Sequence, residues 1–141
     1  MRISTKGRYG LAVMIKLGEN STTVVPISNL SQALGLSKIY LEQVLTLLKA
    51  GNLVTSVKGP QGGYSLMHNK LTIKEILVVL EPSLFEVVED VSTDVFINNV
   101  LCDEVFKPIQ NQLDKFLDTL TLEELVSQVV DQRLDAPMFY I

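Results

Sequence analysis

The sequence predicts a mainly α-helical fold with a small β-hairpin, in which a winged helix-turn-helix is followed by a long C-terminal helix. Three observations predict this fold. Two short amphipathic segments flank the turn Gly35-Leu36-Ser37, a glycine-rich loop then separates two strand-like segments, and an apolar stripe with helical spacing runs from Leu101 to Leu120. The 141 residues suffice for one domain with its own core, or for a small domain with an arm.

Apolar spacing predicts the helices of the first half. The apolar run 11–17 suits a buried helix, and the next segment places Ile27, Leu30 and Leu34 on one face. Ser37 is a good N-cap for the helix that follows. The apolar stripe of that helix consists of Leu41, Val44, Leu45 and Leu48, and its other side carries Lys38, Glu42, Thr46 and Lys49. Two short helices joined through a glycine-containing turn are typical of a helix-turn-helix.

A hairpin and a further helix are predicted next along the chain. Residues 53–58 and 64–67 are strand-like runs on either side of a five-residue loop with three glycines. This arrangement predicts a β-hairpin, which would be the wing. Thr72 and Glu75 then have the spacing of a capping box, which opens a helix that Pro82 ends. The residues of this helix predicted to face inward are Ile73, Ile76, Leu77 and Leu80.

The second half is predicted to carry a long helix behind an irregular connector. Residues 83–99 are acidic and show no clean period. Pro108 lies inside the apolar stripe, so the long helix either begins near Lys107 or kinks there. A second capping box at 121–124 opens a short last helix. We therefore expect a winged helix-turn-helix domain (1–82), an acidic connector (83–99), and a long helix with a C-terminal tail (100–141).

Charge is distributed unevenly between the two halves. Residues 1–70 hold eight basic and two acidic side chains, whereas residues 71–141 hold four basic and fourteen acidic ones. A basic first half favours a phosphate-bearing partner, because electrostatic attraction is local. The alternative is a pair of solvated surfaces of opposite sign that attract each other.

Several function classes are excluded or disfavoured by composition. The single cysteine, Cys102, excludes an internal disulfide and a multi-cysteine zinc site, and the single histidine, His68, argues against histidine-based metal catalysis. No catalytic constellation or phosphate-binding loop is present, so we predict no enzyme activity. No apolar run is long enough for a membrane span or a secretory leader, which predicts a cytosolic protein without a membrane partner. Within the apolar stripe, Cys102 is read as a packing residue, with redox sensing as the alternative.

The start of the second helix of the pair carries candidate base contacts. Ser37, Lys38, Tyr40, Glu42 and Gln43 lie there, and this end of a recognition helix faces base edges in the major groove. Gln43 suits adenine and Glu42 suits the amino group of cytosine. Alternatively, Glu42 pairs with Lys38 on a solvated face. The sequence leaves both readings open.

The wing and the N-terminus carry candidate backbone contacts. Glycines at Gly59, Gly62 and Gly63 keep side chains away, so that backbone N–H groups approach phosphates or the minor groove beside Lys58 and Gln61. The alternative is a plain glycine-rich turn. The segment from 2 to 9 holds three cations and suits either a clamp on the DNA backbone or a solvated leader.

Four segments carry a family resemblance. Arg2-Ile-Ser-Thr-Lys-Gly-Arg-Tyr-Gly10, Tyr40-Leu-Glu-Gln43, Val57-Lys-Gly-Pro-Gln-Gly-Gly-Tyr64 and Leu120-Thr-Leu-Glu-Glu-Leu125 resemble the Rrf-two family of bacterial winged-helix transcriptional regulators. The resemblance covers nearly the whole chain. It implies a homodimer that binds double-stranded DNA at near-palindromic operators, usually as a repressor. By motif position it assigns DNA contacts to Lys6, Tyr9, Ser37, Tyr40, Glu42, Gln43, Lys58 and the wing glycines.

The resemblance also implies that the long C-terminal helix forms the dimer. The residues of the stripe that fit this role are Leu101, Val105, Ile109, Leu113, Phe116, Leu117 and Leu120. An alternative reading is a winged-helix interaction module that has lost DNA binding and binds another protein through its acidic half. The intact Lys6, Tyr9, Gln43 and Lys58 argue against such a loss.

One departure from the family concerns its cofactor. Cluster-binding members carry three cysteines before the dimer helix, and here only Cys102 remains. One thiol cannot hold an iron–sulphur cluster, so no cofactor and no metal are expected. The ending Met138-Phe-Tyr-Ile141 resembles the cluster-free branch that regulates cysteine metabolism together with a cysteine-synthesis enzyme. A metabolic enzyme or a small-molecule effector is therefore a candidate partner.

Overall fold

The protein is described by a computed structural model that covers residues 2–86 and 90–136. The segment 138–141, on which the likeness to the cysteine branch depends, lies outside the described residues. The elements, in chain order, are α1 (Thr5–Glu19), α2 (Ile27–Leu34), α3 (Lys38–Ala50), β1 (Val54–Val57), β2 (Gly63–Leu66), α4 (Ile73–Leu80), a 3₁₀ turn (Pro82–Phe85), α5 (Val95–Leu101), a π turn (Cys102–Phe106), α6 (Lys107–Thr119) and α7 (Leu122–Asp135). The mainly helical fold with a small hairpin is confirmed.

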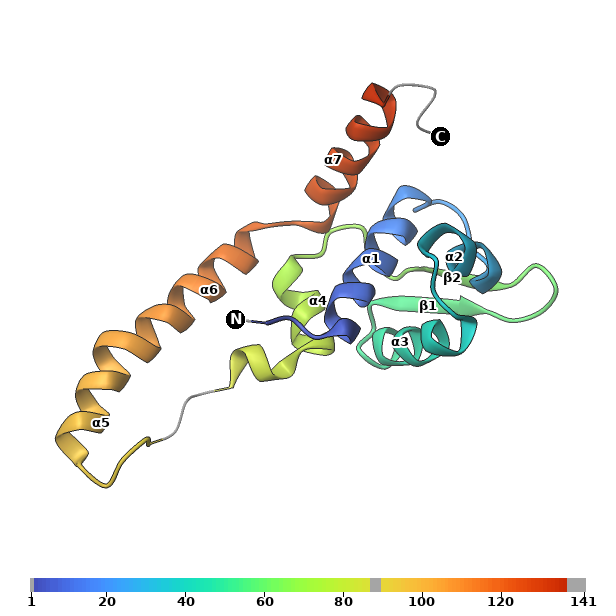
Figure 1. The fold of residues 1–141 in the computed structure, drawn as a ribbon. Helices are drawn as coiled ribbons and strands as arrows, with labels where there is room; N and C mark the ends of the chain where they lie inside the picture. The colour runs from blue at the N-terminus through green and yellow to red at the C-terminus, as the bar shows by residue number, and fades with distance from the viewer. Residues whose placement is uncertain (1, 87–89, 137–141) are drawn as a thin grey trace.

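The elements form a body and an arm. In Figure 1, α1 to α4 and the hairpin make up the body, and α5 and α6 continue each other as a long arm on the side away from the hairpin loop. None of the helices in the described ranges is long and apolar enough to cross a membrane.

The core of the body is built from the predicted stripes. Leu41, Val44, Leu45 and Leu48 of α3 are buried, as are Ile73, Ile76, Leu77 and Leu80 of α4. Both pack with Val13, Met14 and Leu17 of α1 in one cluster. The predicted capping box of α4 is present, since the Thr72 side chain accepts from the Glu75 N–H and the Glu75 side chain accepts from the Thr72 N–H.

Helix α1 begins earlier than the apolar run 11–17 predicted. Its N-cap is Ser4, whose hydroxyl accepts a hydrogen bond from the Gly7 N–H. The Ser4 N–H and hydroxyl in turn donate to the carboxylate of Glu81, at the far end of α4. A tertiary contact therefore starts the helix six residues before its apolar stripe.

The wing is a two-stranded antiparallel hairpin in which Val54 pairs with Leu66 and Val57 with Gly63. Val25, in the loop before α2, adds a short bridge by exchanging backbone hydrogen bonds of 2.8 and 2.9 Å with Tyr64. The wing is thus fastened to the helix-turn-helix on one edge. An alanine Cβ at Gly63 would lie 2.3 Å from the Val25 carbonyl oxygen, so this bridge requires glycine.

The prediction that residues 83–99 are irregular is wrong at both ends of this range, where the structure has regular turns or helix. The 3₁₀ turn occupies the start of this range, and α5 begins at Val95. Asp94 is its N-cap, because the Asp94 carboxylate accepts hydrogen bonds from the N–H groups of Phe96 and Ile97. The buried Asn98 holds the approach to α5, because its side chain accepts from the N–H groups of Val91 and Ser92 and donates to the Ser92 carbonyl.

The π turn resolves the question raised by Pro108. The Lys107 N–H donates to the Cys102 carbonyl, five residues back, and the arm runs through Pro108 as continuous helix. A proline removes one helical donor and crowds the carbonyl four residues earlier. A wider turn just before it relieves that crowding, as is common for π turns inside α-helices.

Helix α7 packs back on the body and is longer than the short helix predicted. Thr121 forms the predicted capping box with Glu124, and Thr121 also bridges to Thr72, so the starts of α7 and α4 lie side by side. Further along, the Arg133 guanidinium donates to both carboxylate oxygens of Glu19 at 2.7 and 3.3 Å. This ion pair closes the α7 end onto α1.

The Glu19–Arg133 pair makes the docking of α7 pH-dependent. The hydrogen bond from Arg133 holds the pKa of the Glu19 carboxyl below its ordinary value of 4.5. Because the pKa is lowered in the folded state, the stabilisation is complete above about pH 4.5 and is lost as pH falls through the folded value. We expect Arg133→Ala to lose about 0.5–1 kcal/mol near pH 7. Thermal melts should show this deficit shrinking towards pH 4. Gln132→Ala, an exposed neighbour on α7, should match wild type at both pH values.

Candidate nucleic-acid interface

The helix-turn-helix is set by two local features. Gly35 ends α2 in the left-handed region, with φ of 67°, where glycine pays no steric penalty. Ser37 then caps α3, because its hydroxyl accepts from the Tyr40 N–H at 3.2 Å. The turn therefore delivers the first turn of α3 to the surface of the body.

The outer face of α3 carries most of the predicted base contacts. Ser37, Lys38, Glu42 and Gln43 are exposed, and none of the ion pairs found among the described residues joins Glu42 to Lys38. The alternative in which those two side chains neutralise each other is thus not formed. The Glu42 carboxylate therefore has no ion-pair partner among the described residues.

Tyr40 also makes a contact within the body. It is half-buried, and its ring meets the ring of Tyr9 edge-on, with centroids 5.6 Å apart. This contact joins the recognition helix to the first turns of α1 and so brings two separately predicted contact groups together.

A cleft of about 470 Å³ lies between α3 and the wing, and lysines converge on it. Lys38 comes from the start of α3, Lys49 from its last turn and Lys58 from the base of the wing loop. The start of α2 also borders the cleft and has no side-chain cap, which leaves the N–H groups of Ile27 and Ser28 available. Positive charge and free N–H groups at one cleft suit a phosphate backbone.

Lys49 is the clearest residue that sequence reasoning missed here. Its ammonium donates to the Ser56 hydroxyl of β1 at 2.7 Å, which holds the lysine against the wing. Spacing assigned it only to the polar side of α3. Lys49 becomes part of the cleft because β1 folds back along α3, and the sequence alone does not show this packing.

The wing tip is compact and open to approach. The Gly62 N–H donates to the Gly59 carbonyl across the loop at 2.9 Å, and Lys58, Gly59 and Gln61 are all exposed. A Cβ at Gly62 would lie 2.1 Å from the Val57 carbonyl oxygen. Glycine at this position is therefore required by the turn itself.

The basic N-terminal segment is anchored rather than loose. Glu81 is buried, and hydrogen bonds from the Ser4 backbone N–H and then from its hydroxyl lower the pKa of the Glu81 carboxyl. Lys6 is half-buried near this carboxylate, and Arg8 and Tyr9 are exposed on the next residues of α1. The anchor fixes these side chains at the α1 edge beside α3.

The predicted dimerisation stripe divides into two faces. Val105, Ile109 and Phe116 are exposed, whereas Leu117 is buried in the protomer's own core and is therefore not available on the outer face. Leu113 and Leu120 pack partly against that core, and Leu101 is half-buried. The sequence missed four exposed apolar residues on α5, which are Val95, Phe96, Ile97 and Val100.

Candidate ligands for metals are few. Cys102 is half-buried at the first position of the π turn. The described ranges contain no group of three or more histidine, cysteine, aspartate or glutamate side chains that could hold a metal ion. An iron–sulphur cluster takes four cysteine or comparable ligands, and one cysteine and one histidine per chain do not supply them. The donor set does not fit a cluster.

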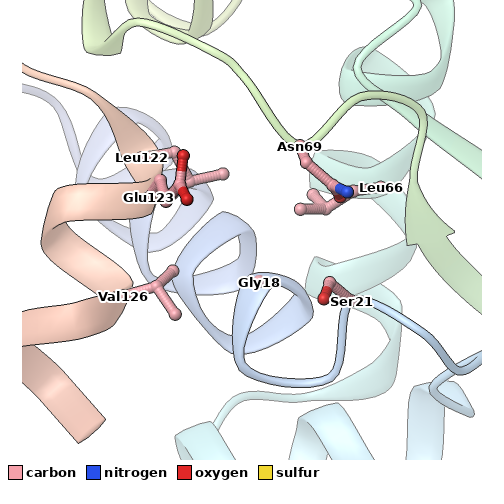
Figure 2. A pocket seen from close by; sticks show the side chains of 7 residues that line it. All are labelled: Gly18, Ser21, Leu66, Asn69, Leu122, Glu123 and Val126. Carbon is pink, nitrogen blue, oxygen red and sulfur yellow. The ribbon is translucent and has the colours of Figure 1, made fainter.

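A small pocket of about 160 Å³ lies on another part of the body (Figure 2). Gly18 and Ser21 border it from the end of α1, Leu66 and Asn69 from the base of the wing, and α7 closes the remaining side. Within the described residues, no buried polar side chain is left without a hydrogen-bond partner. The polar residues that line the pocket, Ser21, Asn69 and Glu123, are exposed.

Comparison with known proteins agrees with this arrangement. The Rrf2 family model, described as an iron-dependent transcriptional regulator, matches residues 3–128. The transcriptional regulator CymR of Bacillus subtilis is 38% identical over 149 residues, covering all of both chains. An IscR of Escherichia coli is 30% identical over 131 residues, covering 90% of this chain and 81% of that protein.

Solved structures give the same relatives. The structure titled as CymR, the global cysteine regulator of B. subtilis, superposes with a TM-score of 0.78 at 34% identity, covering 91% of this chain and 98% of that one. The IscR of T. potens superposes with a TM-score of 0.76 at 28% identity, covering 100% and 97%. With a lysine-lined cleft beside an exposed recognition helix, and with a family match over most of its length, this chain belongs to the Rrf2 family of DNA-binding helix-turn-helix transcriptional regulators.

Proposed function

We propose that the protein is a repressor that binds a near-palindromic operator as a homodimer. The observation that carries this proposal is the cleft between α3 and the wing, where Lys38, Lys49 and Lys58 converge beside the uncapped start of α2. Phosphate contacts of this kind fix the register of a protein on DNA. In this register, Glu42 and Gln43 would reach base edges, and Gln61 with the wing glycines would approach the adjoining backbone or minor groove.

The proposed dimer rests on the outer face of the arm. Ile109 is 58% exposed and Phe116 is 61% exposed, and Phe96 at the tip is 80% exposed. Large exposed apolar side chains repeated along one helical arm support an interaction site there. A second copy of the chain is the partner that would bury this apolar face. A two-fold axis across the arm would place two recognition helices in the two half-sites of one operator.

The proposed regulon is cysteine and sulphur metabolism. The support is the 38% identity to B. subtilis CymR over the whole of both chains, together with a donor set that does not fit a cluster. The protein would act by occupying DNA rather than by catalysis. Its signal would be a small molecule or a metabolic enzyme docking on the acidic second half.

Sensing through Cys102 is a second candidate with weaker support. Redox sensors need an exposed thiolate, and Cys102 is half-buried at the π turn with no second cysteine in the chain. We therefore favour a packing role for this side chain.

The proposed DNA contacts predict two different defects. Lys58→Ala should weaken binding to all duplexes and lower the slope of log affinity against log salt by about 0.9, because one phosphate contact is lost. Gln43→Ala should cost about 1–3 kcal/mol at the cognate site and little on unrelated DNA. Gel shifts at several salt concentrations measure both effects, on operators found by genomic footprinting with sulphur-metabolism genes as the test set.

Lys70→Ala is the matched control, since Lys70 is an exposed lysine in the same basic half that does not border the cleft. It should bind like wild type. If both Lys58→Ala and Gln43→Ala also bound like wild type, the proposed interface would be wrong. If no footprint lay at a sulphur-metabolism gene, the proposed regulon would be wrong, and the proposed DNA interface would be unaffected.

A further inference from the structure

An isoleucine occupies the middle of the proposed DNA-binding face. Ile39, in the first turn of α3, is 73% exposed. Helical spacing places Glu42, Gln43 and Thr46 on the same side, and all three are exposed. The core side of α3 is formed by other residues, so Ile39 contributes almost nothing to the packing of the protomer.

A single exposed apolar side chain is ordinary on a protein surface. Its position is what matters here, because the side chains around it would meet base edges in the major groove. Those edges consist of hydrogen-bond donors and acceptors, with one apolar exception, the C5-methyl group of thymine. An isoleucine pressed against any other edge would remove water from donors or acceptors without replacing the lost hydrogen bonds.

We propose that Ile39 is a specificity-determining residue that reads the 5-methyl group of a thymine in each half-site. This inference rests on the proposed function, since it requires α3 to enter the major groove. The contact is apolar burial, so it favours thymine over cytosine and over uracil. A 5-methylcytosine presents the same methyl group and satisfies the same contact.

The position of this thymine follows from helix geometry. Gln43 lies four residues after Ile39 on the same face, which is about 6 Å along the helix axis. Base pairs are stacked about 3.4 Å apart. The thymine read by Ile39 therefore lies within about two base pairs of the one read by Gln43, and the two residues together specify a short contiguous element.

The test removes the methyl group and nothing else. Operators are first selected with the full-length protein from a library of randomised duplexes, and each thymine of the enriched sequence is then replaced singly by deoxyuridine. For wild type we expect one position per half-site at which the replacement weakens binding about fourfold, the value of one buried methyl-sized group. Ile39→Ala should bind the thymine and deoxyuridine operators equally at that position. Ile39→Val should retain part of the preference, and cytosine there should gain affinity for wild type on 5-methylation.

Folding does not confound the comparison. Ile39 is exposed and alanine is the better helix former, so Ile39→Ala keeps α3 intact. Val78→Ala, at an exposed valine on α4, is the matched control and should keep the full methyl preference. Equal binding of wild type to thymine and deoxyuridine at every position, or an undiminished preference in Ile39→Ala, would overturn the inference alone. A wild-type protein that enriched no sequence would overturn the proposed function and this inference with it.

Discussion

Phe116→Asp is expected to convert the proposed dimer to a monomer and to abolish operator binding in the same step. Phe116 is 61% exposed on the outer face of α6, so the change leaves the protomer's core untouched. Across a two-fold seam, each buried phenyl ring contributes on the order of 1.5–3 kcal/mol. The variant loses this contribution twice and adds two carboxylates that must be desolvated in an apolar seam. Sedimentation velocity at micromolar concentration and gel shifts on the same samples measure both consequences.

Asn111→Asp is the control, because it adds the same charge at an exposed position of α6 well away from the row of Ile109 and Phe116. It should remain dimeric and bind DNA. A Phe116→Asp protein that sedimented with wild type would show that the seam lies elsewhere on the molecule. A monomer with full operator affinity would separate dimerisation from DNA binding and remove the two-half-site geometry.

Gly10→Val is expected to cause a large loss of stability in the body. Gly10 faces α4, and a Cβ there would lie 2.4 Å from Cδ1 and 2.7 Å from Cδ2 of Leu80, which is fully buried. Forcing extra methyl groups into such a contact costs about 1–3 kcal/mol, a large part of the 5–15 kcal/mol typical of a domain. Thermal unfolding should shift down by roughly 5–10 °C.

Gly18→Ala serves as the comparison for Gly10→Val. Its Cβ would also be crowded, at 2.5 Å from Cγ2 of Val126, but that valine is only partly buried on α7, whereas Leu80 is fully buried. A shift clearly smaller than that of Gly10→Val is expected. Equal stability of Gly10→Val and wild type would mean that α1 and α4 separate easily, contrary to the packing described.

The elements that the sequence predicted best are the helices in which an apolar stripe recurs at helical spacing. In α3 and α4 leucine, isoleucine or valine recurs at helical spacing, and both stripes were confirmed as core. Helix α5 was missed because Val95, Phe96 and Ile97 are consecutive and all exposed. Because its apolar residues and its two asparagines stand in consecutive runs, this seven-residue helix gives no helical period to detect.

The spacing of apolar residues also could not show which side chains of α6 face the body and which face outward. Phe116 and Leu117 are neighbours in the same stripe, yet one is exposed and the other is buried on its own body. Which of two adjacent apolar positions turns inward depends on where α6 meets α4, a tertiary relation. The same limit applies to Ser4, whose partner Glu81 is 77 residues away.

At the candidate site, motif residues were predicted and supporting residues were not. The positions Lys58 and Gln43 follow from a loop and a helix that can be read locally. Lys49 joins the cleft only because β1 folds back beside α3. Ile39 carried no signal on its own, since its meaning depends on the polar residues that share its exposed face.

The π turn between Leu101 and Lys107 lets the arm hold one additional residue at one place. Each residue of an α-helix rotates the chain by about 100°, whereas this turn spreads one full rotation over one residue more than an α turn does. Deleting one residue of 102–106 would therefore turn the wide turn into an ordinary one, and Phe96 would keep nearly the same direction relative to Phe116. Deleting one residue elsewhere in α6 between this turn and Phe116 has no wide turn to absorb it and would rotate the tip by about 100°. The wide turn is thus the place where the length of the arm can change without a change in the direction in which it presents its tip.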